Sequence, residues 1–146
     1  DAAAEASLAR SFRELSNASP ALQSPIDIND RSVEVIARTD DVLMCRFAEL
    51  CEKPRSAHDY IEIAREYHAV LLADVPALGA SNDDAARRFI NLVDEFYDRS
   101  VKLIISAERP ILELYDQGRL NFEFQRTQSR LQEMQSREYL AREHRP

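Results

Sequence analysis

The sequence predicts an α/β fold built on a mixed sheet, with a parallel strand-helix-strand unit, a small antiparallel meander and flanking helices. Three observations support this class. Residues 68–75 and 101–106 are apolar runs bounded by turn signals, which is typical of buried strands. Residues 82–98 between them carry apolar side chains at helical spacing. Two buried strands joined by one helix are expected to pair in parallel through a right-handed crossover.

The N-terminal third predicts a helix and then short strands. An amphipathic helix is expected over residues 2–16, where Leu8, Phe12 and Leu15 share one face. A linker rich in turn residues follows. Alternating apolar residues, separated by turns at Asn-Asp and Asp-Asp, then predict three strands at 26–28, 32–37 and 42–47. We expect these strands to form the antiparallel meander.

Two helices are expected in the middle of the chain. Ser56 resembles a helix N-cap, with Asp59 in the first turn, where the helix dipole favours an acid. The second helix opens near Asn82. Its core stripe follows the i, i+3, i+4, i+7 rule through Phe89, Leu92, Val93 and Phe96.

The C-terminal part predicts three further elements. Residues 110–115 start a short helix, and residues 121–124 alternate like a strand with one buried face. Ser129 is placed to cap a final helix that runs to about His144. The apolar stripe of this helix is thin, so we expect it either to cover an edge loosely or to bind a partner.

Composition places the chain among globular domains. Its 146 residues suit one domain, with 45% apolar and 31% charged residues. Apolar runs of about five residues are far shorter than the roughly 18 that a membrane span needs. Cys45 and Cys51 form neither a disulfide framework nor a zinc site, and the histidines show no metal-ligand spacing. We therefore expect packed thiols, a reducing compartment and no metal site.

Charge is unevenly distributed. The net charge of −7 argues against general nucleic-acid binding, which needs a clustered basic face. Residues 1–118 hold 13 basic and 22 acidic residues, whereas residues 119–146 hold 6 arginines and 4 glutamates, a balance of +2. The last quarter is therefore a candidate contact surface, with a solvated arginine-glutamate helix as the alternative.

Several ordered blocks resemble the C-terminal region of the ZapE family, bacterial cell-division ATPases within the AAA-type P-loop proteins. The similarity runs from about residue 24 to residue 144, and the helix at 2–16 matches only loosely. The blocks that carry it lie at 47–51, 55–60, 67–76, 86–98, 101–107, 122–126, 129–136 and 138–140.

The resemblance implies that the chain is part of a longer cytoplasmic protein. That parent would carry a Walker A loop and a Walker B acid pair before residue 1, hydrolyse ATP with Mg²⁺, and act on FtsZ polymers at the division ring. Residues 1–23 would be a helix and linker left from the upstream domain, and residues 24–146 the C-terminal α/β domain. The chain opens Asp-Ala-Ala-Ala without methionine, which fits a fragment. Because Gly79 and Gly118 belong to no phosphate loop, we expect it to bind no cofactor and hydrolyse no ATP alone.

Asp74 and Ser106 are weak candidates for nucleotide binding. Each ends an apolar strand, where α/β folds place functional residues. A Walker B acid is normally followed by a second acid, but Val75 and Pro76 follow Asp74. The alternatives are that Asp74 braces the turn before Pro76 and that Ser106 bonds its own following turn.

Arg87, Arg88, Arg126 and Arg130 are candidates for an arginine finger or sensor. AAA-type ATPases often complete their site with an arginine from a neighbouring subunit or the lid, because the guanidinium fork donates to phosphate oxygens and stays charged. In the predicted elements, Arg126 leaves a strand and Arg130 enters a helix. The alternative is that these arginines form salt bridges, to Glu123, Glu133 or Asp94.

Two hypotheses of function remain open. The domain would serve nucleotide sensing, oligomer contacts through self-association, or FtsZ recognition in the ATPase. Alternatively, it is a pure protein-interaction module that uses its arginine-rich C-terminal helix and has no part in the ATP site. An independent enzyme fits poorly, because no nucleophile-base pair can be assembled from these residues.

Overall fold

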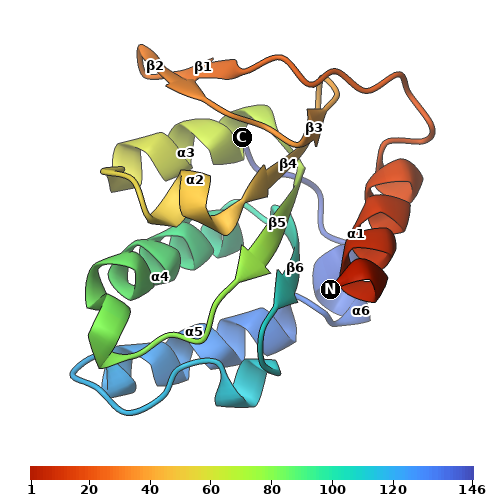
Figure 1. The fold of residues 1–146 in the computed structure, drawn as a ribbon. Helices are drawn as coiled ribbons and strands as arrows, with labels where there is room; N and C mark the ends of the chain where they lie inside the picture. Colours follow the sequence, from red (N-terminus) through yellow and green to blue (C-terminus); the bar gives the residue numbers. More distant parts are fainter.

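The computed structural model describes residues 1–146 and confirms the predicted fold class (Figure 1). The first half contains helix α1 (Ala2–Leu15), strands β1 (Ile26–Ile28), β2 (Arg31–Val33), β3 (Ala37–Arg38) and β4 (Val42–Arg46), and helices α2 (Phe47–Cys51) and α3 (Ala57–Glu66). The second half contains strand β5 (Ala69–Val75), the 3₁₀ turn η1 (Ala80–Asn82), helix α4 (Asp83–Asp98), strand β6 (Lys102–Ala107), the 3₁₀ turn η2 (Ile111–Glu113), and helices α5 (Asn121–Glu133) and α6 (Arg137–Leu140).

The main sheet has the strand order β3-β4-β5-β6. β5 pairs in parallel with β6 across helix α4, which confirms the predicted strand-helix-strand unit. β5 also pairs in parallel with β4, so Val70 lies between Leu43 and Leu103. All three side chains are buried. The apolar runs therefore form the centre of the sheet, as expected for parallel strands covered on both faces.

The predicted three-stranded meander is wrong in its membership. Only β1 and β2 form a separate antiparallel hairpin. β4 instead joins the main sheet, antiparallel to the two-residue β3 and parallel to β5. The reason is its burial on both faces: Val42 and Leu43 are adjacent, and both are fully buried. A meander strand with one solvated face would alternate.

The two faces of the sheet are covered unequally (Figure 1). Helices α2, α3, α4 and α5 pack on one face and form the larger core, which includes Phe89 and Phe96 of α4. Helix α1 covers the other face, with Leu8 and Phe12 as its buried residues. No helix of the structure is both long enough and apolar enough to cross a membrane.

The C-terminal elements differ from the prediction. The expected strand at 121–124 is the first turn of α5. The helix expected from Ser129 to about His144 is also wrong: Ser129 lies inside α5, which ends at Glu133, and a separate short helix, α6, is capped by Ser136 and ends at Leu140. Phe122 is 82% exposed and Phe124 is buried, which alternation in a strand also predicts. On a helix, residues two apart point in nearly opposite directions, and Thr127 and Leu131 continue the buried stripe. The short helix expected at 110–115 is a single 3₁₀ turn.

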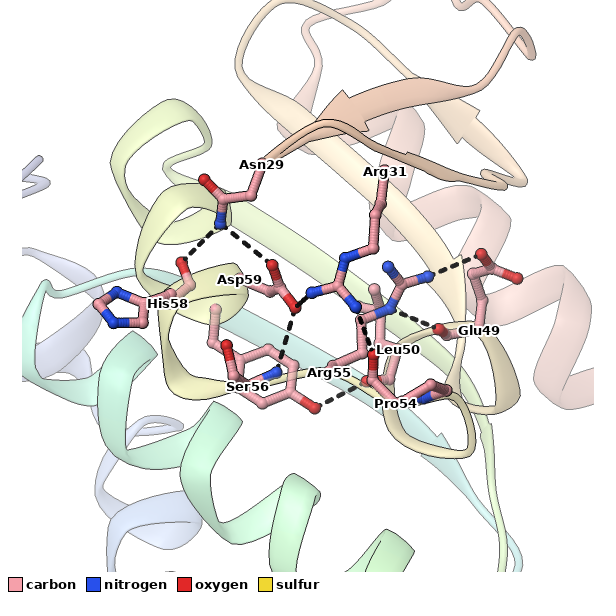
Figure 2. A network of polar contacts seen from close by, with 10 residues as sticks. Asn29, Arg31, Glu49, Leu50, Pro54, Arg55, Ser56, His58 and Asp59 are labelled. Carbon is pink, nitrogen blue, oxygen red and sulfur yellow. Dashed lines mark hydrogen bonds and ion pairs between the residues drawn. The ribbon is translucent and has the colours of Figure 1, made fainter.

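A buried carboxylate fastens the β1–β2 hairpin to helix α3 (Figure 2). Asp59, 1% exposed, accepts hydrogen bonds from the Ser56 amide at 3.1 Å and from the Asn29 side chain at 3.0 Å, and it pairs with the Arg31 guanidinium. Arg31 also donates to the Pro54 carbonyl at 2.7 Å. The N-cap predicted at Ser56 is therefore confirmed. Two residues of the hairpin, Asn29 and Arg31, bind the same Asp59 carboxylate that bonds the Ser56 amide.

A second carboxylate, Glu49 of α2, binds Lys53 and Arg55 of the loop between α2 and α3. It accepts hydrogen bonds from the guanidinium of Arg55, whose side chain is 4% exposed, at 2.9 Å and from the Glu34 amide at 3.1 Å. The Lys53 ammonium lies 2.7 Å away. Burial raises the pKa of Glu49, but the Lys53 and Glu34 hydrogen bonds and the nearby cations outweigh it and lower the pKa below its usual value. The pKa of Asp59 is lowered in the same way, with Asn29, Ser56 and Arg31 outweighing burial.

Replacing Asp59 with asparagine tests the hairpin anchor. Asp59→Asn keeps the side-chain shape but removes the charge that holds Arg31, so we expect a loss of about 2 kcal/mol in unfolding free energy. Urea unfolding followed by circular dichroism measures it. Asp27→Asn, on the exposed face of β1, is the matched control and should be neutral. Equal stability of both variants would contradict the anchor.

The same carboxylate predicts a dependence on pH. A lowered folded-state pKa adds stability above the unfolded pKa of 3.8, and this stability is lost as pH falls through the folded value. The stability difference between wild type and Asp59→Asn should therefore shrink below about pH 4, because the variant has no carboxylate to protonate. Urea unfolding between neutral pH and about pH 3 measures the difference. A difference that stays constant over this range would contradict the assignment.

Candidate functional site

The carboxyl ends of β4, β5 and β6 bring three polar side chains together. Arg46 pairs with Asp74 at 3.1 Å, and the Ser106 hydroxyl accepts a hydrogen bond from the Asp74 amide at 2.9 Å. The two strand-end candidates predicted from the sequence are thus adjacent, as parallel pairing requires. The sequence analysis did not single out Arg46, although it lies at the carboxyl end of a buried strand, as Ser106 does.

Asp74 adopts an unusual backbone conformation. Its φ is 65°, and the register between β5 and β6 shifts between Leu72 and Val75. Aspartate is among the few residues that tolerate this left-handed region. The bulge takes the Asp74 amide out of the regular ladder, and the Ser106 hydroxyl supplies a replacement acceptor. Ser106 therefore bonds the neighbouring strand rather than its own following turn.

A hollow of about 400 Å³ lies at this strand edge. Asp74, Ser106 and Glu108 line it together with Asp1 and Ala4 of helix α1. Three of these five residues are acidic, so the hollow disfavours a polyphosphate. The geometry supports a bracing role for Asp74 and Ser106 at the end of the sheet.

Two of the four candidate arginines share one carboxylate. Arg126 and Arg130 lie one turn apart on α5, and both contact Asp94 of α4, at 3.0 and 2.5 Å. Their predicted placement, at a strand end and a helix start, is wrong because residues 121–133 form a single helix. The salt bridges to Asp94 that the sequence offered as an alternative are present.

The two arginines differ in how firmly they are held. Arg130 is 23% exposed, and its guanidinium lies 4.7 Å from the centre of the Tyr97 ring, a cation–π contact. Arg126 is 63% exposed, and its contact with Asp94 is its sole ion pair. Asp94 would still be compensated by Arg130 if Arg126 moved away. Arg126 is thus the more available of the two.

The other two candidates fasten α4 to its neighbours. Arg87 is half-exposed and pairs with Glu123 of α5 at 3.1 Å. Arg88 donates to the carbonyl oxygen of Cys51, the last residue of α2, at 3.1 Å. Three of the four arginines therefore form ion pairs that join α4 to α5. Arg88 instead donates to a carbonyl group at the C-terminus of α2.

The cysteines belong to the core and not to a site. Cys45 and Cys51 are free and fully buried, as expected of packed thiols. Burial raises the pKa of each thiol to about 12, so neither is a thiolate at neutral pH.

Comparison with known proteins identifies relatives over most of the chain. The sequence profile of the AFG1-like ATPase family matches residues 1–143. The cell division protein ZapE of Escherichia coli K12 is 52% identical over 119 residues, which cover 82% of this chain and 32% of that protein. Lactation elevated protein 1 homolog B of Danio rerio is 38% identical over 109 residues, 75% of this chain and 22% of that protein. No solved structure matches.

These similarities agree with the sequence blocks that suggested the family. The chain spans about a third of the length of the ZapE relatives that it matches. The family profile covers almost every residue, including helix α1, which the blocks matched only loosely. The chain therefore belongs to the AFG1-like ATPase family.

Proposed function

We propose that this chain is the C-terminal domain of an ATPase that resembles the cell division protein ZapE. The observation that carries the proposal is the 52% identity to ZapE over 82% of the chain. The longer protein would hydrolyse ATP with Mg²⁺ in the cytoplasm and act on FtsZ polymers at the division ring. These 146 residues would not hydrolyse ATP alone, because they contain no glycine-rich loop to hold the phosphates.

The contribution of this domain to ATP hydrolysis would be an arginine. A guanidinium that stays charged and donates in a fixed fork suits the phosphoryl transition state of a neighbouring subunit. Arg126 fits this role best of the four candidates, because it is 63% exposed and shares Asp94 with the better-held Arg130. Self-association of the longer protein would place Arg126 near the nucleotide of the adjacent subunit.

The other sequence candidates fit supporting roles. Arg130, Arg87 and Arg88 are engaged in contacts that fix α4, so their loss would act through the position of the helices. Asp74 and Ser106 brace the strand ends, and their acidic surroundings argue against direct contact with nucleotide.

A second candidate function is a protein-interaction module without a part in the ATP site. The observation that favours it is Phe122, which is 82% exposed in the first turn of α5. Arg126 lies four residues later on the same side of the helix. Aromatic and arginine side chains are the types that dominate the binding energy of protein interfaces.

The arginine assignment is tested in the longer protein. Arg126→Ala should lower ATP turnover by about 1,000-fold with ATP affinity retained, as expected for loss of an arginine finger. Arg87→Ala is the matched control, because it removes one ion pair of the same α4–α5 clasp and should cost at most about 1 kcal/mol of stability. Steady-state hydrolysis and nucleotide titration separate the two effects. Unchanged turnover in Arg126→Ala would remove this residue from the ATP site.

The module hypothesis is tested on the 146-residue chain. If the α5 surface recognises FtsZ, the chain alone should bind it, and Phe122→Ala should weaken binding by about 10-fold or more. Leu112→Ala is the control, because Leu112 is also an exposed apolar residue but lies on η2. Titration by fluorescence anisotropy measures both. Absence of binding by the wild-type chain would reject the module as a complete account of the function.

A further inference from the structure

Strand β6 is the last strand of the main sheet, and one of its edges has no partner (Figure 1). The Lys102 amide donates to the His68 carbonyl, on the β5 side. Because alternate residues of a strand direct their backbone groups to the same neighbour, Ile104 also faces β5, whereas Leu103 and Ile105 face away. No hydrogen bond outside the sheet ladders reaches the backbone of Leu103 or Ile105.

The same edge is covered at its start and open beyond it. The Tyr139 hydroxyl of α6 donates to the Val101 carbonyl at 2.6 Å. After Val101 no other element hydrogen-bonds to this edge. Leu103 is buried, but Ile104 and Ile105 are only partly buried, unlike the fully buried Leu71 and Leu72 opposite them. Lys102 is the one charged residue of β6, and residues 103–107 contain neither proline nor charge, two of the devices that keep an exposed edge strand from pairing. This edge therefore has the chemistry of an interior strand.

The helix layer is also thin on this side of the molecule. Parallel sheets are normally covered on both faces, but the α1 face is covered by one helix with two buried side chains. Ile104 packs at the margin of that smaller core and stays partly exposed. Strand β6 therefore has both an unpaired edge and a side, facing α1, that is only partly covered.

Helix α1 begins near the carboxyl end of β6. Asp1 and Ala4 line the same hollow as residues 74–76 and 106–108, at the carboxyl ends of β5 and β6. In a longer chain, a polypeptide that preceded Asp1 would therefore enter at the ends of these two strands, of which only β6 has a free edge. The ZapE relatives are about three times as long as the region matched, which leaves ample chain to supply another strand.

We propose that a strand from the polypeptide preceding residue 1 in the longer ATPase pairs with the free edge of β6 and continues the sheet. The inference rests on the proposed function in that it takes the chain to be one part of a longer ATPase. It adds the surface through which the two parts would join: the backbone of Leu103 and Ile105, flanked by Ile104 and the α1 helix.

Amide hydrogen exchange, resolved by NMR, tests the proposal. In the 146-residue chain, Leu103 and Ile105 should exchange about 100-fold faster than Ile104, whose amide is bonded to β5 and serves as the internal control. In the longer protein, Leu103 and Ile105 should be slowed by about 100-fold, with Ile104 little changed. If these two amides exchange equally fast in both proteins, the proposal is overturned. Slow exchange in the short chain that depends on its concentration would also overturn it, because two copies would then be pairing.

A pair of variants in the longer protein isolates the backbone contribution. Ile105→Pro removes the outward N–H and is compatible with an edge strand, whereas Ile105→Ala shortens the side chain and keeps the N–H. Leu103 should lose its protection in the proline variant and keep it in the alanine variant. Equal protection in both would overturn the proposal. ATP turnover by the longer protein is measured separately. If the protein hydrolyses ATP but Leu103 and Ile105 are not protected from exchange, the added strand is rejected and the proposed function stands. If the two amides are protected but no ATP is hydrolysed, the proposed function is rejected and the added strand stands.

Discussion

The structure depends on the burial of strand β5 between two parallel neighbours. Every residue of β5 except Asp74 is buried, so its backbone groups must be satisfied by β4 and β6 and its side chains by helices on both faces. That requirement places α2, α3 and α4 on one face and α1 on the other. It also explains why the polar groups gather where the strands end: the Asp74 amide leaves the ladder there and needs Ser106 as an acceptor.

Helix α4 connects the sheet to the arginines of α5. Its buried side fits the sheet through Phe89 and Phe96, and its outer side presents Asp94 to α5. Because Asp94 contacts two arginines, either of them can hold α5 in place while the other changes partner. The position of Arg126 is therefore set by the core, although its side chain is exposed. A candidate catalytic arginine supported in this way would be well placed but free to change partner.

The elements that could be predicted from the sequence are those whose hydrophobic pattern is compatible with only one type of secondary structure. Residues 68–75 and 101–106 are continuous apolar runs, and α4 has an unbroken helical stripe, so the centre of the sheet could be predicted along with the adjacency of Asp74 and Ser106. β4 was misassigned because a short apolar run does not reveal its partner. The start of α5 was misassigned because Phe122 and Phe124 show one exposed and one buried aromatic in a helix as in a strand. The anchor from Arg31 to Asp59 spans 28 residues, and no local spacing encodes it.

The central proposal is that this domain supplies a necessary part of a longer ATPase and does not hydrolyse ATP alone. The most direct measurement is ATP turnover by three samples: chain 1–146 alone, the longer protein cut off before residue 1, and the two mixed. The account predicts no turnover by the chain alone, impaired turnover by the truncated protein, and recovery on mixing. Full turnover by the truncated protein, unchanged when chain 1–146 is added, would contradict it.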